Sequence, residues 1–425
     1  MSAQPSSARL HARKQAMDDL DHRSLGPRLD LWHIQEDAPG MVFWHPRGHT
    51  LYRVLEDDIR GRMRRLGYAE VRTPQLLPRE LWMRSGHWDK FGDHMFSLGE
   101  GERAMALKPM SCPCHVQIFN GGLRSWRELP LRYAEFGICH RDEPSGALHG
   151  LMRTRGFEQD DAHVFCRAED VAGEVARFVA LLTEVYTAFG FAAPEVSLST
   201  RPLLRAGSDA LWDWAEAALA DAARGCGLSY AIQPGEGAFY GPKLEFALRD
   251  RLGRSWQCGT VQLDSVLPDR LGASYVAADG TRATPVMIHH AVFGSIGRFI
   301  AMLLEHHAGA LPFWLSPDQV AVAPIAQDQA DYAMQVLAAF DAAGLRGVLL
   351  ADGETLSRRI VAARAASIPV VAVVGAREAA QGTVSLRERD GTTSVLTLDR
   401  AVSTLSERNR PPRASVDRAG GADLD

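Results

Sequence analysis

The sequence predicts an α+β fold, in which helices pack on an antiparallel sheet, followed by a small α/β domain. Two observations lead to this prediction. Amphipathic helices and short β-rich stretches occupy separate blocks as far as Pro312, and strands and helices alternate regularly after Pro317. Separate blocks are typical of α+β domains, whereas repeated βα units with an apolar central strand indicate a largely parallel sheet.

The first predicted helix covers residues 49–66, where apolar residues recur at steps of three and four and Gly67 follows as a stop. Its other face is either an ordinary solvated face or a contact with nucleic acid or another subunit, because it carries Arg60, Arg62, Arg64 and Arg65. A second helix is expected over 171–189, with Asp170 as its N-cap, and a third follows Ser208.

Strands of the first domain are predicted from short β-rich stretches at 131–139, 156–165, 243–250 and 255–263. In the second domain, strands are expected at 320–325, 347–351 and 369–375, and helices at 327–343 and 355–366. Residues 383–389 and 394–398 are expected to form a closing hairpin.

These patterns divide the chain into domains at 18–314 and 315–408, flanked by tails at 1–17 and 409–425 that we expect to be disordered. No apolar run approaches the roughly 18 residues of a membrane span, and the N-terminus has no apolar signal region. Both observations argue against a membrane or secreted protein. Six cysteines without disulfide-framework spacing predict a cytoplasmic protein with reduced thiols. The net charge of -5 argues against nonspecific nucleic-acid binding but leaves room for a local basic patch.

Polar residues of catalytic type are densest between Lys108 and His163. Two strand-like runs there are joined by a polar loop, which predicts an antiparallel hairpin. Arg141 and Glu143 alternate at the end of the first run, and Arg153 enters the second. They either form ordinary surface ion pairs or clamp a phosphate and an adenine edge.

Cys112, His163 and His289 are candidate metal ligands, but their spacing matches no zinc-finger pattern. Spacing alone leaves the alternatives open. Without further information the residues favour the ordinary roles, in which Cys112 is a buried thiol, His163 a core histidine and His289 or His290 a surface residue.

Longer motifs are far more specific than these spacings. In chain order they read EVRTPQLL, SGHWDKFGDHMF, KPMSCPCHVQIF, RYAEFGICHRDEPSGALHGLMRTRGFEQDDAHVFC, GAFYGPKLEF, WQCGTVQLD and MIHHAVFGSIGRFIAMLLE. From about residue 21 to about residue 407 the chain resembles the bacterial threonyl-tRNA synthetases, which are class II aminoacyl-tRNA synthetases. The resemblance implies an antiparallel-sheet catalytic domain, an anticodon-binding α/β domain, and a homodimer whose interface includes the motif ending at Pro74.

The resemblance also implies a binding site for ATP with Mg2+. Arg141 would hold the α-phosphate, Glu143 the adenine amino group and Arg298 the γ-phosphate. Arg153 would position the triphosphate and Phe157 would stack on adenine, with Gln257 beside them. Arginines suit this task because their forks are bidentate and stay charged.

For the amino acid, the resemblance implies one zinc ion (Zn2+) per subunit, held by Cys112, His163 and His289. L-threonine would bind it through its amino group and hydroxyl, and Asp161 would accept the hydroxyl proton. The pocket would be completed by Gln159, Tyr240 and Gln257. His87 and Gln262 match residues near the terminal ribose of tRNA(Thr), and His87 is the candidate base for transfer.

Four departures from the family pattern matter. The chain matches the family from the catalytic domain onward, so we expect no editing of serine in cis. Cys114 stands where the family has glycine, and is either a small buried filler or a residue that tunes the metal pocket. His290 and Gly297 replace a basic and an acidic residue. The family's anticodon run is also altered at residues 352–355, where Glu354 is kept, and Arg387 remains a candidate RNA contact.

Three functions follow. The first is a threonine–tRNA ligase that makes threonyl-adenylate and then charges tRNA. The second is a specialised or resistance paralogue that activates threonine for a biosynthetic pathway or another acceptor. The third is a noncatalytic regulator, which the intact Arg141, Glu143 and Arg298 argue against.

Overall fold

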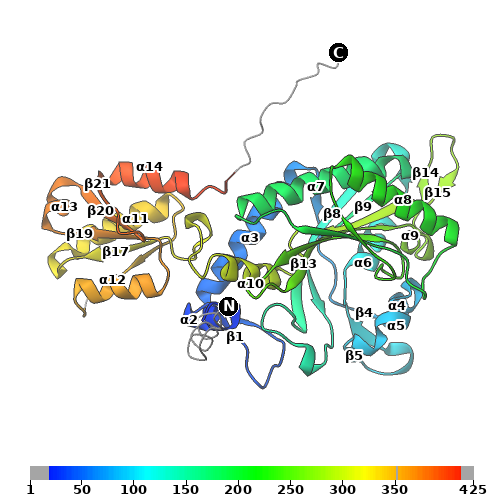
Figure 1. Cartoon of the computed structure of the whole chain (residues 1–425), viewed down its shortest axis with the longest axis horizontal. Helices are drawn as coiled ribbons and strands as arrows, with labels where there is room; N and C mark the ends of the chain where they lie inside the picture. Colours follow the sequence, from blue (N-terminus) through cyan, green and yellow to red (C-terminus); the bar gives the residue numbers. More distant parts are fainter. Residues whose placement is uncertain (1–18, 351–352, 413–425) are drawn as a thin grey trace, which may run out of the picture. The chain divides into compact units, whose positions relative to one another are not determined.

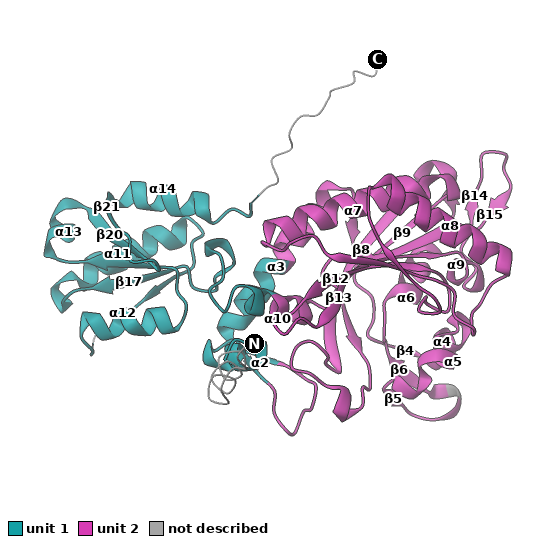
Figure 2. Cartoon of the chain, viewed as in Figure 1, with its two compact units in different colours: residues 1–33, 43–55, 303–412 teal, residues 34–42, 56–302, 413–425 magenta. Residues whose placement is uncertain are grey.

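The computed structural model describes residues 19–350 and 353–412. The tail expected at 1–17 and most of the tail expected at 409–425 lie outside them, as does Asp352 of the anticodon run. Contacts divide the described chain into two compact units (Figure 2). Unit 1 comprises 19–33, 43–55 and 303–412, and unit 2 comprises 34–42 and 56–302. The domain boundaries expected from the sequence stay predictions.

Unit 2 is built on an eight-stranded sheet with the order β11-β10-β12-β13-β16-β9-β8-β3 (Figure 1). All pairs from β10 to β8 are antiparallel, and the two edge pairs are parallel, which confirms the predicted sheet. The strands are β3 (Ala69–Glu70), β8 (Leu131–His140), β9 (Gly156–Cys166), β10 (Glu195–Ser199), β11 (Ala231–Gln233), β12 (Lys243–Arg249), β13 (Ser255–Asp264) and β16 (Val286–Ala291).

Helices cover both faces of this sheet (Figure 1). On one face lie α7 (Val171–Ala188) and α8 (Asp209–Gly225), and Phe178 of α7 packs on Phe246 and His290. On the other lie α6 (Cys112–Phe119) and α9 (Leu267–Arg270), where Phe119 stacks on Phe165 at 4.5 Å between ring centroids. The smaller elements of unit 2 are β4 (Leu76–Pro78), α4 (Arg79–Ser85), α5 (His87–Phe91), β5 (Ser97–Leu98), β6 (Met105–Leu107), β7 (Arg124–Ser125), β14 (Tyr275–Val276) and β15 (Arg282–Ala283).

Two details differ from the sequence prediction. Asp170 is the N-cap residue of α7, as predicted, but its side chain makes no capping hydrogen bond, because its carboxylate bonds the Arg167 guanidinium at 2.8 and 2.9 Å. In α3 (Pro46–Arg65) the arginines are not one solvated face. Arg62 is 3% exposed and pairs with Asp58 and Glu184, whereas Arg64 and Arg65 are exposed.

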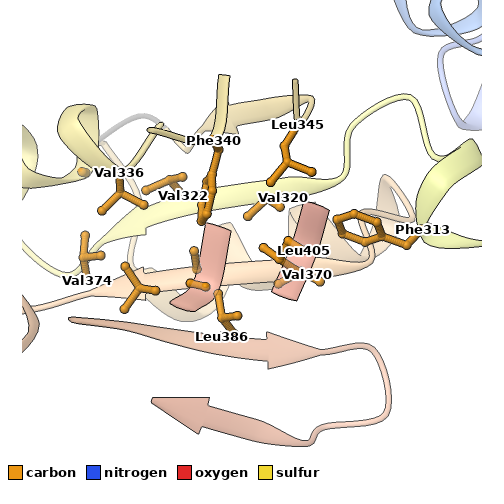
Figure 3. Close-up of a cluster of buried hydrophobic side chains, with 14 residues drawn as sticks. Phe313, Val320, Val322, Val336, Phe340, Leu345, Val370, Val374, Leu386 and Leu405 are labelled. Atoms are coloured by element: carbon orange, nitrogen blue, oxygen red, sulfur yellow. The ribbon is translucent and has the colours of Figure 1, made fainter. Parts of the chain in front are cut away.

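Unit 1 contains a five-stranded sheet with the order β18-β17-β19-β20-β21. The first three strands are parallel and the hairpin is antiparallel, as predicted. Every residue of β17 and β19 is buried because alternate side chains enter two cores. One core holds Phe340 and Leu405 (Figure 3), and the other holds Ala363 and Ile368.

The elements of this sheet and its helices are β17 (Val320–Pro324), α11 (Ala330–Ala342), β18 (Gly347–Leu349), α12 (Leu356–Ala365), β19 (Val370–Val374), α13 (Ala376–Gln381), β20 (Thr383–Glu388), β21 (Thr393–Thr397) and α14 (Leu398–Arg408). Unit 1 also contains α2 (His22–Arg28), β1 (Trp32–His33) and β2 (Phe43–Trp44), and α10 (Ile296–His306), like α3, contributes to both units. Within the described ranges, every helix is too short or too polar to cross a bilayer.

Gly241 offers a direct test of backbone packing in unit 2. A Cβ at this position would lie 1.8 Å from the carbonyl oxygen of Leu263. We expect Gly241→Ala to lower the free energy of unfolding by about 1–3 kcal/mol, because backbone must move to admit the methyl group. Gly173→Ala is the matched control. No heavy atom lies within 4 Å of its added Cβ on the exposed side of α7, so stability should rise by up to about 1 kcal/mol. Guanidinium unfolding followed by tryptophan fluorescence measures both, and equal midpoints would contradict this account.

Candidate functional site

A cavity of about 410 Å³ lies on the α6 face of the sheet in unit 2. It gathers nine of the residues singled out in the sequence, from the β8–β9 hairpin, β13, the segment before β12 and the start of α10. They are Arg141, Glu143, Arg153, Phe157, Gln159, Tyr240, Gln257, Gln262 and Arg298.

Strand alternation explains most of this gathering. Successive side chains of a strand point to opposite faces, so Phe157, Gln159, Asp161 and His163 of β9 share one face. Antiparallel pairing then sets His289 opposite His163, and Gln262 opposite His289. Polar residues from three strands thereby meet on one surface.

Gln257 reaches the same cavity through an irregularity. It lies five residues before Gln262, a spacing that a regular strand would send to the other face. The register shifts between Phe246 and Ala247, which pair with Gly259 and Gln257 and leave Cys258 as the extra residue. A β-bulge of this kind re-aims the side chains that precede it.

Cys112, His163 and His289 form a compact set of metal-ligand atoms. Their ligand atoms all lie within 4.8 Å of one another, and the side chains are 2%, 1% and 5% exposed. Nε2 of His163 lies 3.1 Å from Nδ1 of His289. Two nitrogens on one tetrahedral zinc ion, each at about 2.0–2.1 Å from the metal, lie roughly 3.3 Å apart. The set therefore fits a small tetrahedral metal ion.

In His163 and His289, the ring nitrogen that points away from the ligand set already has a hydrogen-bond partner. Nε2 of His289 lies 2.9 Å from a carboxylate oxygen of Asp264, and Nδ1 of His163 lies 2.8 Å from Nδ1 of His115. Such outer partners are typical of metal-binding histidines because they fix the ring and the tautomer. Burial, together with the neighbouring His115 and His289, holds the pKa of His163 well below its usual range. The ring is therefore neutral, as a metal ligand must be.

Arginines on the cavity wall are fixed mainly by main-chain carbonyls. Arg298 donates to the carbonyls of Met152 and Gln257 at 2.9 and 2.7 Å. Arg141 donates to the carbonyl of Pro109 at 3.2 Å, and its guanidinium carbon lies 5.1 Å from the Phe157 ring centroid. Carbonyl acceptors orient a guanidinium without neutralising it, so both charges remain available to an anionic ligand.

Arg153 behaves differently, because it forms an ion pair with Glu143 at 2.8 Å. The ordinary ion pair considered from the sequence is therefore present for these two residues. The pair is half exposed on the arginine side, at 49%, so a ligand can compete for it.

The remaining predicted residues lie around the ligand set. Tyr240 donates to Oε1 of Gln262 at 2.8 Å, and its ring stacks on His289 at 5.0 Å between centroids. Asp161 lies 3.8 Å from Nε2 of His163. His87 is fully buried, with Nδ1 2.8 Å from Oγ of Ser85 and Nε2 3.6 Å from Sγ of Cys112.

Sequence reasoning missed several residues that line the cavity, namely Met110, Lys243, Thr260 and Ser295. Strand alternation would have found Thr260, two residues before Gln262. Cys114 is buried and packs with Trp82, Met95 and Ala106, which is the environment expected of a buried filler.

Comparisons with known proteins identify the family to which both domains are similar. Residues 95–307 match the family described as tRNA synthetase class II core domain (G, H, P, S and T), and residues 319–408 match the anticodon binding domain. The threonine–tRNA ligase of Caulobacter vibrioides (strain NA1000 / CB15N) is 55% identical over 395 residues, which are 92% of this chain and 60% of that protein. The threonine–tRNA ligase of Methylococcus capsulatus (strain ATCC 33009 / NCIMB 11132 / Bath) is 54% identical over 371 residues, 87% of this chain and 58% of that protein. The chain thus spans about 60% of the length of these curated relatives.

A solved structure extends the likeness to three dimensions. The RNA binding domain of threonyl-tRNA synthetase from Cryptosporidium parvum Iowa II is 39% identical and superposes with a TM-score of 0.90. The match covers 93% of this chain and 99% of that one. The chain therefore belongs to the class II tRNA synthetases and, among them, to the threonyl-tRNA synthetase family.

Proposed function

We propose that this chain is a threonine–tRNA ligase, which activates L-threonine with ATP and transfers it to the 3′ end of tRNA(Thr). One observation carries the proposal. The set formed by Cys112, His163 and His289 adjoins a cavity whose wall holds two carbonyl-fixed arginines, Arg141 and Arg298. An amino-acid site and an anion site therefore share one pocket.

ATP with Mg2+ would occupy the arginine side of this pocket. Arg141 and Arg298 would face the phosphate oxygens, which gain negative charge as the threonine carboxylate attacks the α-phosphate. Glu143 would accept from the adenine amino group, and Phe157 would stack on the base. Arg153 would exchange part of its pairing with Glu143 for the triphosphate.

Threonine would occupy the other side. Cys112, His163 and His289 would hold one zinc ion, which when bound offers an open coordination position to a hydroxyl oxygen. Asp161 lies close enough to the ligand set to accept the hydroxyl proton. The walls would be Gln159, Tyr240 and Gln257, while His87 and Gln262 would act near the terminal ribose of tRNA.

The proposal extends to partners and location. Residues 319–408 match an anticodon binding domain, which supports tRNA as the partner of unit 1.

A homodimer is supported by a partly apolar hollow of about 110 Å³ beside Ile59, Met63 and Phe136, on the helix that the family resemblance places at the subunit interface. Sedimentation velocity of the chain tests it. All six cysteines are free, which is consistent with the cytoplasm, where we propose that the protein acts.

Threonine-dependent exchange of pyrophosphate into ATP tests activation, and charging of tRNA(Thr) transcripts tests transfer. We expect both. Absence of exchange would overturn the proposal, and exchange without charging would leave threonine activation with a different acceptor.

A first prediction concerns the metal ligand. We expect Cys112→Ala to lose zinc on dialysis and to lower the exchange rate by more than about 100-fold, because one of three protein ligands is gone. Cys114→Ala is the matched control and should keep about one zinc ion per chain, because Cys114 packs among apolar side chains. Atomic emission measures the zinc content. Equal zinc content in the two variants would contradict the assigned ligand set.

A second prediction concerns amino-acid choice. Serine has the same hydroxyl as threonine and lacks one methyl group, which is worth about 1–3 kcal/mol, so its kcat/KM for activation should be about 10- to 200-fold lower. Valine lacks the hydroxyl and should be rejected by roughly 10⁴-fold or more. Exchange assays with the three amino acids measure this order, and the chain should form measurable Ser-tRNA. Serine rejected as strongly as valine would contradict a site that reads the hydroxyl.

A further inference from the structure

We propose that His115 is a positioning residue that fixes the tautomer and orientation of His163, and that Glu135, held by Thr73 and Lys108, fixes His115 in turn. The inference rests on the proposed zinc site and deepens it. None of these four residues belongs to the cavity wall described above, and none was singled out from the sequence.

The four residues form a continuous buried chain of hydrogen bonds that ends at His163. Nδ1 of His115 lies 2.8 Å from Nδ1 of His163, and Nε2 of His115 lies 3.1 Å from Oε2 of Glu135. Glu135 also receives the Lys108 ammonium at 3.0 Å and the Thr73 amide at 2.8 Å. The side chains are nearly inaccessible, at 0% for His115 and Lys108 and 3% for Glu135.

With a metal ion on Nε2 of His163, Nδ1 of this ring carries the hydrogen, and the hydrogen bonds between these four residues then permit one arrangement. An ionised carboxylate only accepts, so Nε2 of His115 must donate to Glu135. Nδ1 of a neutral His115 then carries a lone pair and accepts from Nδ1–H of His163. The remaining nitrogen of His163, Nε2, is left with its lone pair, and it is the atom that lies 3.1 Å from His289.

Glu135 is suited to be the fixed end of this series of hydrogen bonds. Burial alone would raise the pKa of this carboxyl. Hydrogen bonds from His115 and Thr73, with the Lys108 ammonium, outweigh burial and lower the pKa to about 2. The carboxylate therefore stays an acceptor, and its position is set by groups on three separate segments of the chain.

His289 is oriented in a simpler way, since Asp264 contacts it directly at 2.9 Å. Asp264 itself accepts from the amides of Val266 and Leu267, at 2.7 and 2.9 Å. Both histidine ligands thus end on an anchored carboxylate, and His163 differs only in reaching it through a second imidazole.

The test compares two nearly isosteric substitutions, His115→Asn and His115→Leu. The amide oxygen of asparagine can take the place of Nδ1 and accept from His163, whereas leucine cannot, and both remove the donor to Glu135. We expect His115→Leu to weaken zinc binding by about 10- to 100-fold, and His115→Asn to weaken it by less than about tenfold. Competition with a chelating dye gives the dissociation constants, and the visible spectrum of the Co2+-substituted protein reports ligand geometry.

Tyr186→Phe is the control for general weakening of unit 2. Tyr186 lies on α7, on the face of the sheet opposite to the ligand set. The substitution removes its buried hydrogen bond to the Val292 carbonyl at 3.0 Å and should leave zinc binding unchanged. Equal losses in the asparagine and leucine variants, or no loss in either, would overturn the role of His115. Because the assay needs neither ATP nor threonine, a wild-type chain that bound no zinc would instead show that the proposed metal site itself is wrong.

Discussion

The pairing register of β9 and β16 is the constraint on which the site depends. His163 lies opposite His289 in this register, and the next strand outward sets Gln262 opposite His289. A slip of one residue in either strand would turn the histidine of that strand toward α7 and bring Ala162 or His290 to the site in its place, because side chains alternate across a strand. The register is held by apolar residues on the other face, where Phe178 packs on His290 and Phe246. Apolar packing on the α7 face of the sheet therefore fixes where His163 and His289 lie on the opposite face.

Burying the polar face of the large sheet costs free energy. The structure offsets this cost by giving the buried polar side chains hydrogen-bond partners, which are linked to one another in series. An unpaired polar group in the interior loses its hydrogen bonds to water and gains nothing in return. Here Lys108, Thr73 and His115 converge on Glu135, and Asp160 accepts from the amides of Val292 and Phe293 on the opposite face. Burial raises the pKa of Asp160 to about 7 despite those amides. The two carboxylates therefore anchor the central strands from opposite sides.

The sequence pattern predicted the long helices α3, α7, α8, α11 and α12. It also predicted four of the eight strands of the large sheet and all five strands of the sheet in unit 1, including β17 and β19, whose fully buried residues form uninterrupted apolar runs. It missed β16, which is buried over all six residues, because His289 and His290 interrupt its apolar run. The sequence pattern could not place Gln257 in the cavity, because the spacing of residues along β13 does not reveal the bulge between Gln257 and Gly259. Nor did spacing predict the proposed metal ligands Cys112, His163 and His289, which lie far apart in sequence and meet only through strand register and the start of α6. Their assignment came from the family motifs. The N-cap position at Asp170 was predicted correctly, but spacing did not show that its carboxylate bonds Arg167, three residues earlier, in place of the helix amides.

The carbonyl anchors of Arg298 have a consequence for how the site tolerates substitution. Its acceptors are the main-chain oxygens of Met152 and Gln257, and every amino acid carries such an oxygen. Replacing either side chain leaves the anchor in place, so the direction of this arginine is encoded by the path of the backbone. Gln257 can thus vary what its side chain reads while the same residue keeps the guanidinium aimed. The amino-acid selectivity and the phosphate binding that we propose for this pocket are therefore free to diverge separately, provided that the bulge which sets the path of β13 is retained.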